Sequence, residues 1–435
     1  MTSNSSTLQP LDLPNKLAGN PLNPPRYAVR VKNARGEKIV LGDPAITRAL
    51  VALMDVHAIN AGAACHWGGP AAFAEIMSAA HGLMFAAQSK PWHEAFNFVN
   101  DAGHTENGLY ALRANYNYGG LTFEDLKKFR SLGSKLTGHG ESHLYPEGIL
   151  LSNGPLGSAF PQSQGLALAD KAAGRSRVTI CAISDGAMME GEAKEALAAI
   201  PGFAAKGKLN PYMLILSDND TKLSGRISQD AFSMEPTFCS METLGWNVIR
   251  VENGHDLQAV YLAVEKGVEA ARLNPAKPVC LWVKTIKGYG VKATMENASG
   301  SHSFPLKDGE KIIEFVNEIC GGNPPAEIAA WAAELRRDWE EKQKNKTTAT
   351  ASAVKKDKVQ AGLSEGAIQA AREGYPVFSI SSDVQGSTGM AAFQKSFPER
   401  FLDVGVAEAN MISVGAGFAK AGFIPIVDTF AQFGV

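Results

Sequence analysis

From about residue 44 to residue 320, apolar runs rich in β-branched residues alternate with Ala-rich segments of helical character. Strands that alternate with helices predict a parallel sheet covered by helices on both faces. The sequence therefore predicts an α/β fold with doubly wound parallel sheets. The expected strands are Val178–Ser184, Tyr212–Ser217, Asn247–Glu252 and Val279–Thr285, and the expected helices include Glu190–Ala205 and Asp256–Ala271.

The same pattern divides the chain into four segments. Residues 1–43 begin with a stretch rich in Pro, Asn and Ser and are expected to form an extended arm. Residues 44–320 form the first α/β domain, and residues 321–362 have the composition of an exposed, charged linker. A second α/β domain is expected over residues 363–435, with strands at Pro376–Ser382, Phe401–Val406 and Phe423–Phe430 and a helix at Glu408–Gly422.

Composition excludes several classes of function. The 435 residues are 45% hydrophobic and 20% charged, which is typical of a globular protein with more than one core. The formal net charge of −2 creates no global field that favours nucleic acid or an anionic membrane. No segment approaches the roughly 20 apolar residues of a membrane span, and the five cysteines include no CxxC pair. We therefore expect a cytoplasmic protein that binds neither nucleic acid nor membranes.

Polar side chains follow two consecutive predicted strands. Asp185 comes directly after Val178–Ser184, and Asn219 follows the next strand. Ligands of open parallel sheets bind beyond the carboxyl ends of the strands, and carboxylate, amide and carbonyl oxygens are the ligands that Mg²⁺ prefers. Gly186 would let the backbone approach a phosphate closely. The alternative interpretation is that Asp185 caps the next helix and that residues 217–225 form a polar turn.

A resemblance to a known family favours the ligand-binding interpretation. Asp185-Gly186, Glu190-Gly191 and Asp218-Asn219 resemble the thiamine-diphosphate signature that runs from Gly-Asp-Gly to Asn-Asn, with Ser184 at the first Gly. Further stretches resemble the transketolase family in the same order along the chain. They are AGAACHWGGPAAFAEI (61–76), Asp101-Ala-Gly-His104, LTFEDLKKFRSLGSKLTGHGE (121–141), Gly154-Pro-Leu-Gly157 and KTIKGYGVKATMENASGSHSFPLK (284–307).

This resemblance implies the thiamine-diphosphate-binding fold and transfer of a two-carbon ketol unit from a ketose or ketose phosphate to an aldose or aldose phosphate. The cofactors would be thiamine diphosphate and Mg²⁺. The metal ligands would be Asp185, Asn219 and Thr221. Each of the four family histidines also has an alternative interpretation as a structural residue. By the resemblance, His66 and His302 would transfer protons, His104 would contact the cofactor phosphate, and His139 would hold a substrate hydroxyl; His66, His139 and His302 would contact the substrate.

In the second domain, LDVGVAEANMISVGAGFAKAG (402–422) resembles the family segment that carries the cofactor-activating acid and places Glu408 there. A Glu at this point is also an ordinary residue for the first turn of a helix. Ser387 is expected to reach the substrate. The remaining cofactor-binding residues implied by the resemblance are Gly154, Leu156, Gly186, Glu190, Asn219, Asp383, Phe430 and Phe433.

The resemblance also implies assembly, namely a homodimer with active sites at the subunit interface. The chain ends at Val435, and we expect its second domain to be incomplete. Ala407-Glu408-Ala409 is closer to deoxyxylulose-phosphate synthases, and Ala361 stands where a phosphate-binding arginine is expected. A related synthase, a decarboxylating component for 2-oxoacids and a non-catalytic or split subunit that needs a partner chain are therefore the alternatives.

Overall fold

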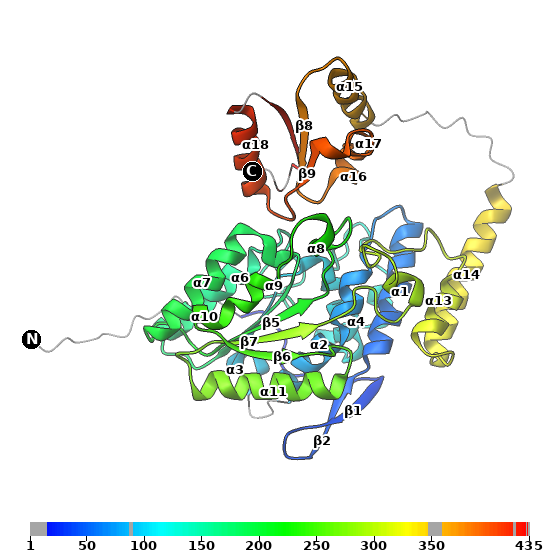
Figure 1. Ribbon diagram of the computed structural model, residues 1–435. Helices are drawn as coiled ribbons and strands as arrows, with labels where there is room; N and C mark the ends of the chain where they lie inside the picture. The colour runs from blue at the N-terminus through cyan, green and yellow to red at the C-terminus, as the bar shows by residue number, and fades with distance from the viewer. Residues whose placement is uncertain (1–14, 87–89, 347–358, 421–422, 432, 434–435) are drawn as a thin grey trace, which may run out of the picture.

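The computed structural model describes residues 15–86, 90–346, 359–420, 423–431 and 433. The first fourteen residues of the expected arm and residues 347–358 of the expected linker lie outside them. Figure 1 shows a large α/β unit, coloured blue to yellow, and a smaller one in orange and red that lies over one side of it. The predicted fold class, parallel sheets with helices on both faces, is confirmed.

The first domain contains a five-stranded parallel sheet. Its strands lie in the order β3-β4-β5-β7-β6. Alternate residues of each strand contribute to two separate cores, so Ile180 packs on one face and Cys181 on the other. The strand bounds are β3 Phe96–Asn100, β4 Val178–Ser184, β5 Tyr212–Asp218, β6 Asn247–Val251 and β7 Val279–Lys284.

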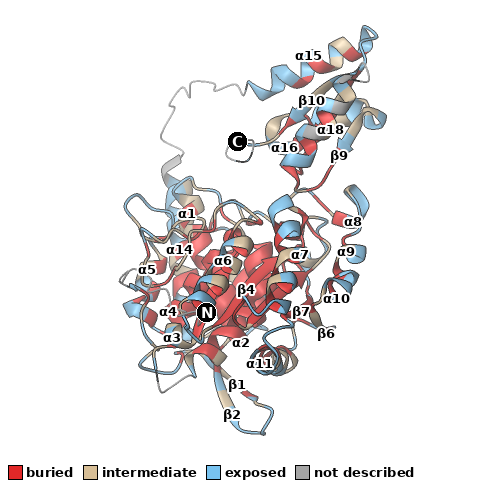
Figure 2. Ribbon diagram, turned by 90° about the vertical axis from the view of Figure 1, so that its left-hand side faces the viewer, coloured by how far each residue is buried: buried red, intermediate tan, exposed pale blue. Residues whose placement is uncertain are grey.

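Helices cover both faces of this sheet, and for that reason its central strands appear fully buried in Figure 2. Helices α2 (Gly68–Phe85) and α11 (Leu257–Leu273) pack on one face. Helices α6 (Ala159–Ala172) and α7 (Gly191–Ala205) pack on the other face. The carboxyl ends of the strands remain uncovered by these helices, and all five strands point to the same edge.

A further helical layer packs outside α2 and differs from the expected linker. It consists of α1 (Pro44–Asn60), α4 (Glu106–Asn115), α13 (Ile312–Ile319) and α14 (Ala326–Lys346). Residues 321–362 were expected to be an exposed linker, but the first half of α14 belongs to the core of the first domain. The reason is an apolar stripe at helical spacing within a charged segment. The buried residues of this stripe are Ile328, Trp331, Ala332 and Leu335.

The arm expected over residues 1–43 contains a β-hairpin. Strands β1 (Ala28–Lys32) and β2 (Lys38–Gly42) pair in antiparallel fashion. The side-chain oxygen of Asn33 accepts hydrogen bonds from the amides of Arg35 and Glu37, which closes the turn. Leu41 is buried against α2, so the hairpin is anchored to the first domain rather than extended.

The second domain is a three-stranded parallel sheet in the order β10-β8-β9. Figures 1 and 2 show it next to the carboxyl edge of the first sheet. The expected helix at Glu408–Gly422 corresponds to α18, whose last two expected residues lie outside the described part. The element bounds are α15 Gln360–Arg372, β8 Val377–Ser381, α16 Gln385–Thr388, α17 Ala391–Ser396, β9 Phe401–Asp403, α18 Glu408–Lys420 and β10 Ile424–Asp428.

Short helical segments complete the connections. Among the described residues, no helix combines the length and the apolar character that crossing a membrane requires. The α-helical segments are α3 Trp92–Ala95, α5 Phe123–Leu126, α8 Ile227–Asp230, α9 Glu235–Cys239, α10 Met241–Leu244 and α12 Lys292–Met295. The 3-10 segments are Gly103–Thr105, Tyr118–Gly120, Ala187–Met189 and Pro398–Arg400.

Candidate functional site

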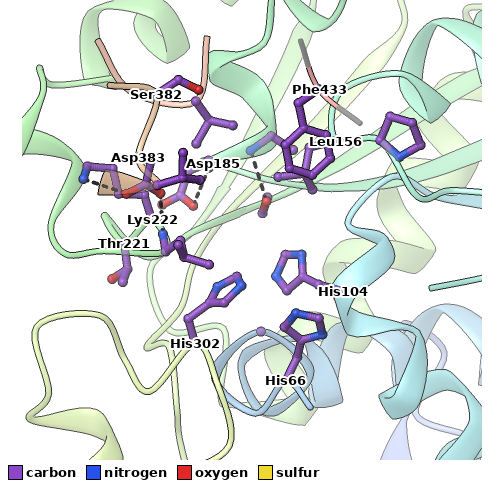
Figure 3. A pocket seen from close by; sticks show the side chains of 18 of the residues that line it. His66, His104, Leu156, Asp185, Thr221, Lys222, His302, Ser382, Asp383 and Phe433 are labelled. Carbon is purple, nitrogen blue, oxygen red and sulfur yellow. Dashed lines mark hydrogen bonds and ion pairs between the residues drawn. The ribbon is translucent and has the colours of Figure 1, made fainter. Parts of the chain in front are cut away.

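A cavity of about 550 Å³ lies between the carboxyl edge of the first sheet and the second domain. Its size is that of a pocket for a small molecule or cofactor. Loops and strand ends of both domains contribute to its wall (Figure 3). The expected site residues that line it are His66, His104, His139, Gly154, Leu156, Asp185, Gly186, Asn219, Thr221, His302, Asp383, Glu408, Phe430 and Phe433.

Two loops far apart in the sequence bring His66 and His302 together. The amide of Trp67 donates to the carbonyl of His302 over 3.0 Å, and His66 forms an isolated bridge with Ser303. The side-chain amide of Asn107 donates to the carbonyl of His66 and ties this loop to α4. The centroids of the His66 and His302 rings are therefore 5.2 Å apart, and both rings face the cavity in Figure 3.

His104 and His139 complete the cluster of four imidazoles. His104 follows β3, and a Cβ atom on Gly69 would lie only 2.5 Å from its Nε2, so this packing requires glycine. The ring of His139 lies 5.6 Å from that of His66. Asn153 accepts a hydrogen bond from the amide of Gly140 and so holds the His139 loop beside the Gly154 loop.

Burial keeps these histidines neutral near pH 7. Burial lowers the pKa of His66 to about 3, and the neighbouring His139 adds to the shift. Burial likewise lowers the pKa of His104 and His302 well below the ordinary value and lowers that of His139. The Nδ1 atoms of His104 and His302 are buried without a hydrogen-bond partner within the described chain. Neutral imidazoles without partners are suited to bind polar groups and accept protons.

Asp185 organises the loop that follows the next strand. Its Oδ2 accepts hydrogen bonds from the amides of Asn219 (2.7 Å) and Asp220 (2.6 Å), and its Oδ1 accepts one from Gly186 (2.9 Å). Burial and the neighbouring Asp218 raise the pKa of Asp185. The Asn219 Oδ1 atom is buried and has no partner among the described residues. A carboxylate and an unsatisfied amide oxygen that share one cavity wall fit a hard divalent cation.

The described residues contain no group of three or more His, Cys, Asp or Glu side chains that could hold a metal ion. An Mg²⁺ site here would therefore take one carboxylate, one amide oxygen and the backbone carbonyl of Thr221, with the other ligands from outside the chain.

Lys287 and the loop that begins at Gly154 also line the cavity. The carboxylate of Asp101 accepts hydrogen bonds from the amides of Gly157 and Phe160, each over 2.8 Å, and so fixes the Gly154–Gly157 loop. The buried Lys287 amine donates to the carbonyls of Lys222 (3.1 Å) and Thr221 (3.4 Å). Burial lowers the pKa of Lys287, an effect that the carboxylate of Asp185 partly offsets. Lys287 therefore brings a cationic group next to Asp185 and to the carbonyls of the loop that follows Asn219.

The second domain contributes an acid and two aromatic rings. Glu408 begins α18 and accepts a hydrogen bond from the Thr429 hydroxyl over 3.2 Å. Glu190 of the first domain is hydrogen-bonded to Glu408, and burial together with this carboxylate raises the pKa of Glu190 to about 9. Glu190 therefore keeps its proton near pH 7. Phe430 and Phe433 line the cavity, with ring centroids 5.7 Å apart.

Three expected site residues are placed differently from the rest. Glu190 contacts Glu408 but does not line the cavity. Ser387 lies in α16, is exposed and does not line the cavity, because its short helix turns it toward solvent. Asp383 lines the cavity, but its carboxylate already accepts hydrogen bonds from Lys222, Leu223 and Ser224.

Lys222 and Lys287 are cavity residues that the sequence reasoning missed. Both stand inside motifs that the sequence had singled out, TKLSG after Asn219 and KTIKGYG before His302. The sequence offered one signal for each: Lys222 lies within three residues of the expected ligands Asn219 and Thr221, and Lys287 lies in a Gly-containing loop. Only the structure shows that both amines turn inward.

Comparison with protein families gives two matches that together span the described site. Residues 45–372 match the family model for the transketolase thiamine diphosphate binding domain. Residues 356–435 match the model for the transketolase pyrimidine binding domain. The first match covers most of the chain.

Individual relatives agree with this assignment. A transketolase of Staphylococcus aureus (strain MRSA252) is 35% identical over 245 residues, which are 54% of this chain and 35% of the relative. Transketolase 1 of Vibrio parahaemolyticus is 29% identical over 427 residues, 84% of this chain and 61% of the relative. The chain thus spans between one third and two thirds of the length of these relatives.

Solved structures match in fold. A transketolase from Leishmania mexicana has 21% identity and a TM-score of 0.53, covering 90% of this chain and 65% of that one. The transketolase from Campylobacter jejuni has 25% identity and a TM-score of 0.53, covering 89% of this chain and 65% of that one. These likenesses support the α/β fold of a thiamine-diphosphate enzyme.

Proposed function

Because the chain belongs to the transketolase family, we propose that it transfers a two-carbon ketol unit from a ketose to an aldose, with thiamine diphosphate and Mg²⁺ as cofactors. The observation that carries this proposal is the cavity between the two domains. It combines four neutral histidines, of which His104 is buried and the other three are partly buried, with a carboxylate and an amide oxygen suited to a divalent cation. Sugar chemistry needs such neutral bases beside a bound cofactor.

The residues of the chain divide into those that hold the diphosphate end and those that hold the ring end. Mg²⁺ would bind the side-chain oxygens of Asp185 and Asn219 and the carbonyl of Thr221. His104 and the backbone at Gly154, Leu156 and Gly186 would contact the diphosphate. Phe430 and Phe433 would pack against the pyrimidine, with Asp383 nearby and Glu190 acting through Glu408. The bound cofactor would supply the carbanion and the electron sink of the reaction.

Two proton-transfer positions follow from the burial of the site. Glu408 would hydrogen-bond a ring nitrogen of the pyrimidine, while Glu190 keeps a proton on the carboxyl pair. His66 and His302 face the same cavity with ring centroids 5.2 Å apart, and they would transfer the proton that leaves a sugar hydroxyl. His139 would hold the hydroxyl of the two-carbon unit. Ser387, on α16, lies outside the cavity and would reach only a long substrate.

The test of this function is a panel of ketose donors, phosphorylated and unphosphorylated, given to the full protein with Mg²⁺, thiamine diphosphate and an aldehyde acceptor. We expect a product that is two carbons longer than the acceptor. If pyruvate replaces the ketose as donor and releases carbon dioxide, the chain works as a related synthase. If no donor reacts although the cofactor binds, ketol transfer is wrong.

The synthase is the second candidate because of the alanines on either side of Glu408. Ala407 and Ala409 flank Glu408, as in deoxyxylulose-phosphate synthases, and Ala361 replaces the expected phosphate-binding arginine. Among the residues that line the described cavity, none is an arginine. This observation favours donors without a phosphate group within the panel.

We also propose a cytoplasmic homodimer whose active sites use two chains. In the structure, the cavity is lined by both domains of one chain. The same contacts between a first and a second domain can form across a two-fold axis. Sedimentation of the full protein tests the dimer, and mixing of two inactive variants tests the shared site.

A further inference from the structure

The Lys222 side chain crosses from the first domain to the second. It is 0% exposed, and its amine lies 2.9 Å from Asp383 Oδ1 and 2.7 Å from Asp403 Oδ2. The same amine donates to the hydroxyl of Ser224 over 2.6 Å. A lysine ammonium has three donors, so these three contacts satisfy it completely. Figure 3 shows Lys222 directed at Asp383 rather than at the histidines.

Asp383 also accepts hydrogen bonds from the two residues that follow Lys222. Its Oδ2 accepts a hydrogen bond from the amide of Leu223 over 2.6 Å, and its Oδ1 accepts one from the amide of Ser224 over 3.0 Å and one from the Ser224 hydroxyl. Asp383 has a φ of +64°, which an L-residue adopts only where its surroundings stabilise it. The hydrogen bonds from residues 222–224 therefore stabilise the strained backbone conformation of Asp383.

The cluster sets one ammonium against two carboxylates, and none of the three side chains is more than 3% exposed. Burial alone would lower the pKa of Lys222, but the Asp383 and Asp403 carboxylates outweigh burial and raise it. Burial raises the pKa of Asp403, which also accepts a hydrogen bond from the amide of Gly405. Removal of the lysine would leave two carboxylates of the second domain buried without a counter-ion, which is strongly unfavourable.

The segment that Lys222 occupies is also the loop of the candidate metal site. Asn219 and Thr221 precede it directly, and Asp185 holds the amide of Asn219. The amine of Lys287 donates to the carbonyls of both Thr221 and Lys222. A shift of Lys222 therefore moves the backbone on which the carbonyl of Thr221 lies.

We propose that Lys222 is a positioning residue that docks the second domain on the first through Asp383 and Asp403 and couples this docking to the loop that carries Asn219 and Thr221. The docking itself requires no cofactor. The coupling to the metal loop rests on the proposed function, so the two parts are measured separately.

Hydrogen exchange of the full protein without cofactor tests the docking. We compare wild type with Lys222→Met, with Asp403→Asn and with the double variant. Exchange at residues 377–403 and at the amides of Leu223 and Ser224 should become at least about tenfold faster in each single variant. Lys222→Met leaves two buried carboxylates without this counter-ion, and Asp403→Asn removes one of the ion pairs of the buried Lys222 amine. The double variant should show less than the sum of the two effects, because the residues act as a pair.

Lys127→Met is the matched control. Lys127 forms a partly exposed ion pair with Glu334 on the first domain, far from Asp383 and Asp403 in the sequence. Its loss should leave exchange at residues 377–403 unchanged. Exchange in β4 should stay as in wild type in all variants, which separates domain docking from general unfolding. If Lys222→Met does not fold, Asp403→Asn gives the same comparison from the other side.

Wild-type exchange at residues 377–403 in both Lys222→Met and Asp403→Asn would overturn the docking role. Additive effects in the double variant would contradict a direct pair. For the coupling, calorimetry should show Mg²⁺–thiamine diphosphate binding weakened at least about tenfold in Asp403→Asn, a residue outside the cavity lining. Unchanged affinity would overturn the coupling alone, whereas absence of binding in wild type would overturn the proposed function and leave the exchange result standing.

Discussion

Burial decides the protonation of the residues at this site. Sequence reasoning placed His66, His104, His139 and His302 in loops that converge, and the structure brings all four to one cavity. Their neutrality could not be predicted from the sequence, because it follows from the depth of each ring and from the positive charge of Lys287 nearby. The mechanism thus depends on a tertiary property of residues that the sequence identifies by type alone.

The same effect predicts a pH dependence of stability at His81, a core residue. Burial lowers the pKa of His81 to about 3, against about 6.5 in the unfolded chain. The contribution of neutral His81 to the free energy of unfolding is present above the unfolded pKa and is lost as the pH falls from about 6.5 toward 3. Between pH 7 and pH 5, this single histidine should lower the free energy of unfolding by about 2 kcal/mol. From pH 7 to pH 5, the free energy of unfolding in urea should therefore fall by about 2 kcal/mol less in His81→Leu than in wild type. An equal fall in both proteins would contradict this prediction.

Glu408 carries the second prediction at the scale of one residue. Glu408→Gln removes the carboxylate that is hydrogen-bonded to Glu190 but changes little packing. We expect the variant to bind the cofactor and to exchange the C2 proton of bound thiamine diphosphate at least about a hundredfold more slowly, because the general acid–base contribution is lost. Exchange is followed by NMR after acid quench. Wild-type exchange would make Glu408 an ordinary first-turn residue of α18.

At the scale of elements, alternation of residue types predicted the strands well. β4 has the expected bounds, and β5, β6 and β7 differ from the expectation by one residue each. The buried strands β4, β5 and β7 read as continuous apolar runs, whereas β6 is only partly buried. β3 was missed because its sequence, FNFVN, contains two asparagines. The buried half of α14 was missed because charged residues surround its apolar stripe, so composition hid its periodicity.

Helix α14 gives a direct test of this element. Leu335 is fully buried against α1 and α13, so Leu335→Ala should destabilise the first domain by about 2–5 kcal/mol. Arg337→Ala, two residues farther along on the exposed side, should change stability by less than about 0.5 kcal/mol. Chemical denaturation measures both. Equally small changes in stability for the two substitutions would mean that this segment is an exposed linker, as its composition suggested.

At the scale of the whole molecule, the sequence predicted two domains but not how they meet. The contact depends on Lys222, whose partners Asp383 and Asp403 lie more than 150 residues away in the chain, and no local pattern marks such a pair. Asp383 lines the cavity, and the sequence predicted it as a cofactor contact. The structure adds its bonds to the first domain, which a motif alone could not show.

Mixing two variants shows whether the two domains at each site come from one chain or from two. Asp185→Ala and Glu408→Gln each disable one side of the cavity. If each site uses two chains, mixed dimers of the full protein contain one intact site, and activity should recover to about a quarter of wild type. If both sides come from one chain, every site keeps one defect and no activity returns. The proposed shared site predicts recovery.

The central claim, a cavity that binds thiamine diphosphate through Mg²⁺ held at Asp185, is tested most directly by calorimetry. Thiamine diphosphate is titrated into wild type, Asp185→Ala and the control Asp125→Ala, whose side chain caps an exposed helix outside the cavity. Each titration is made with and without Mg²⁺. The account predicts Mg²⁺-dependent binding in wild type and Asp125→Ala and its loss in Asp185→Ala. Equal, Mg²⁺-dependent affinity in all three proteins would contradict it.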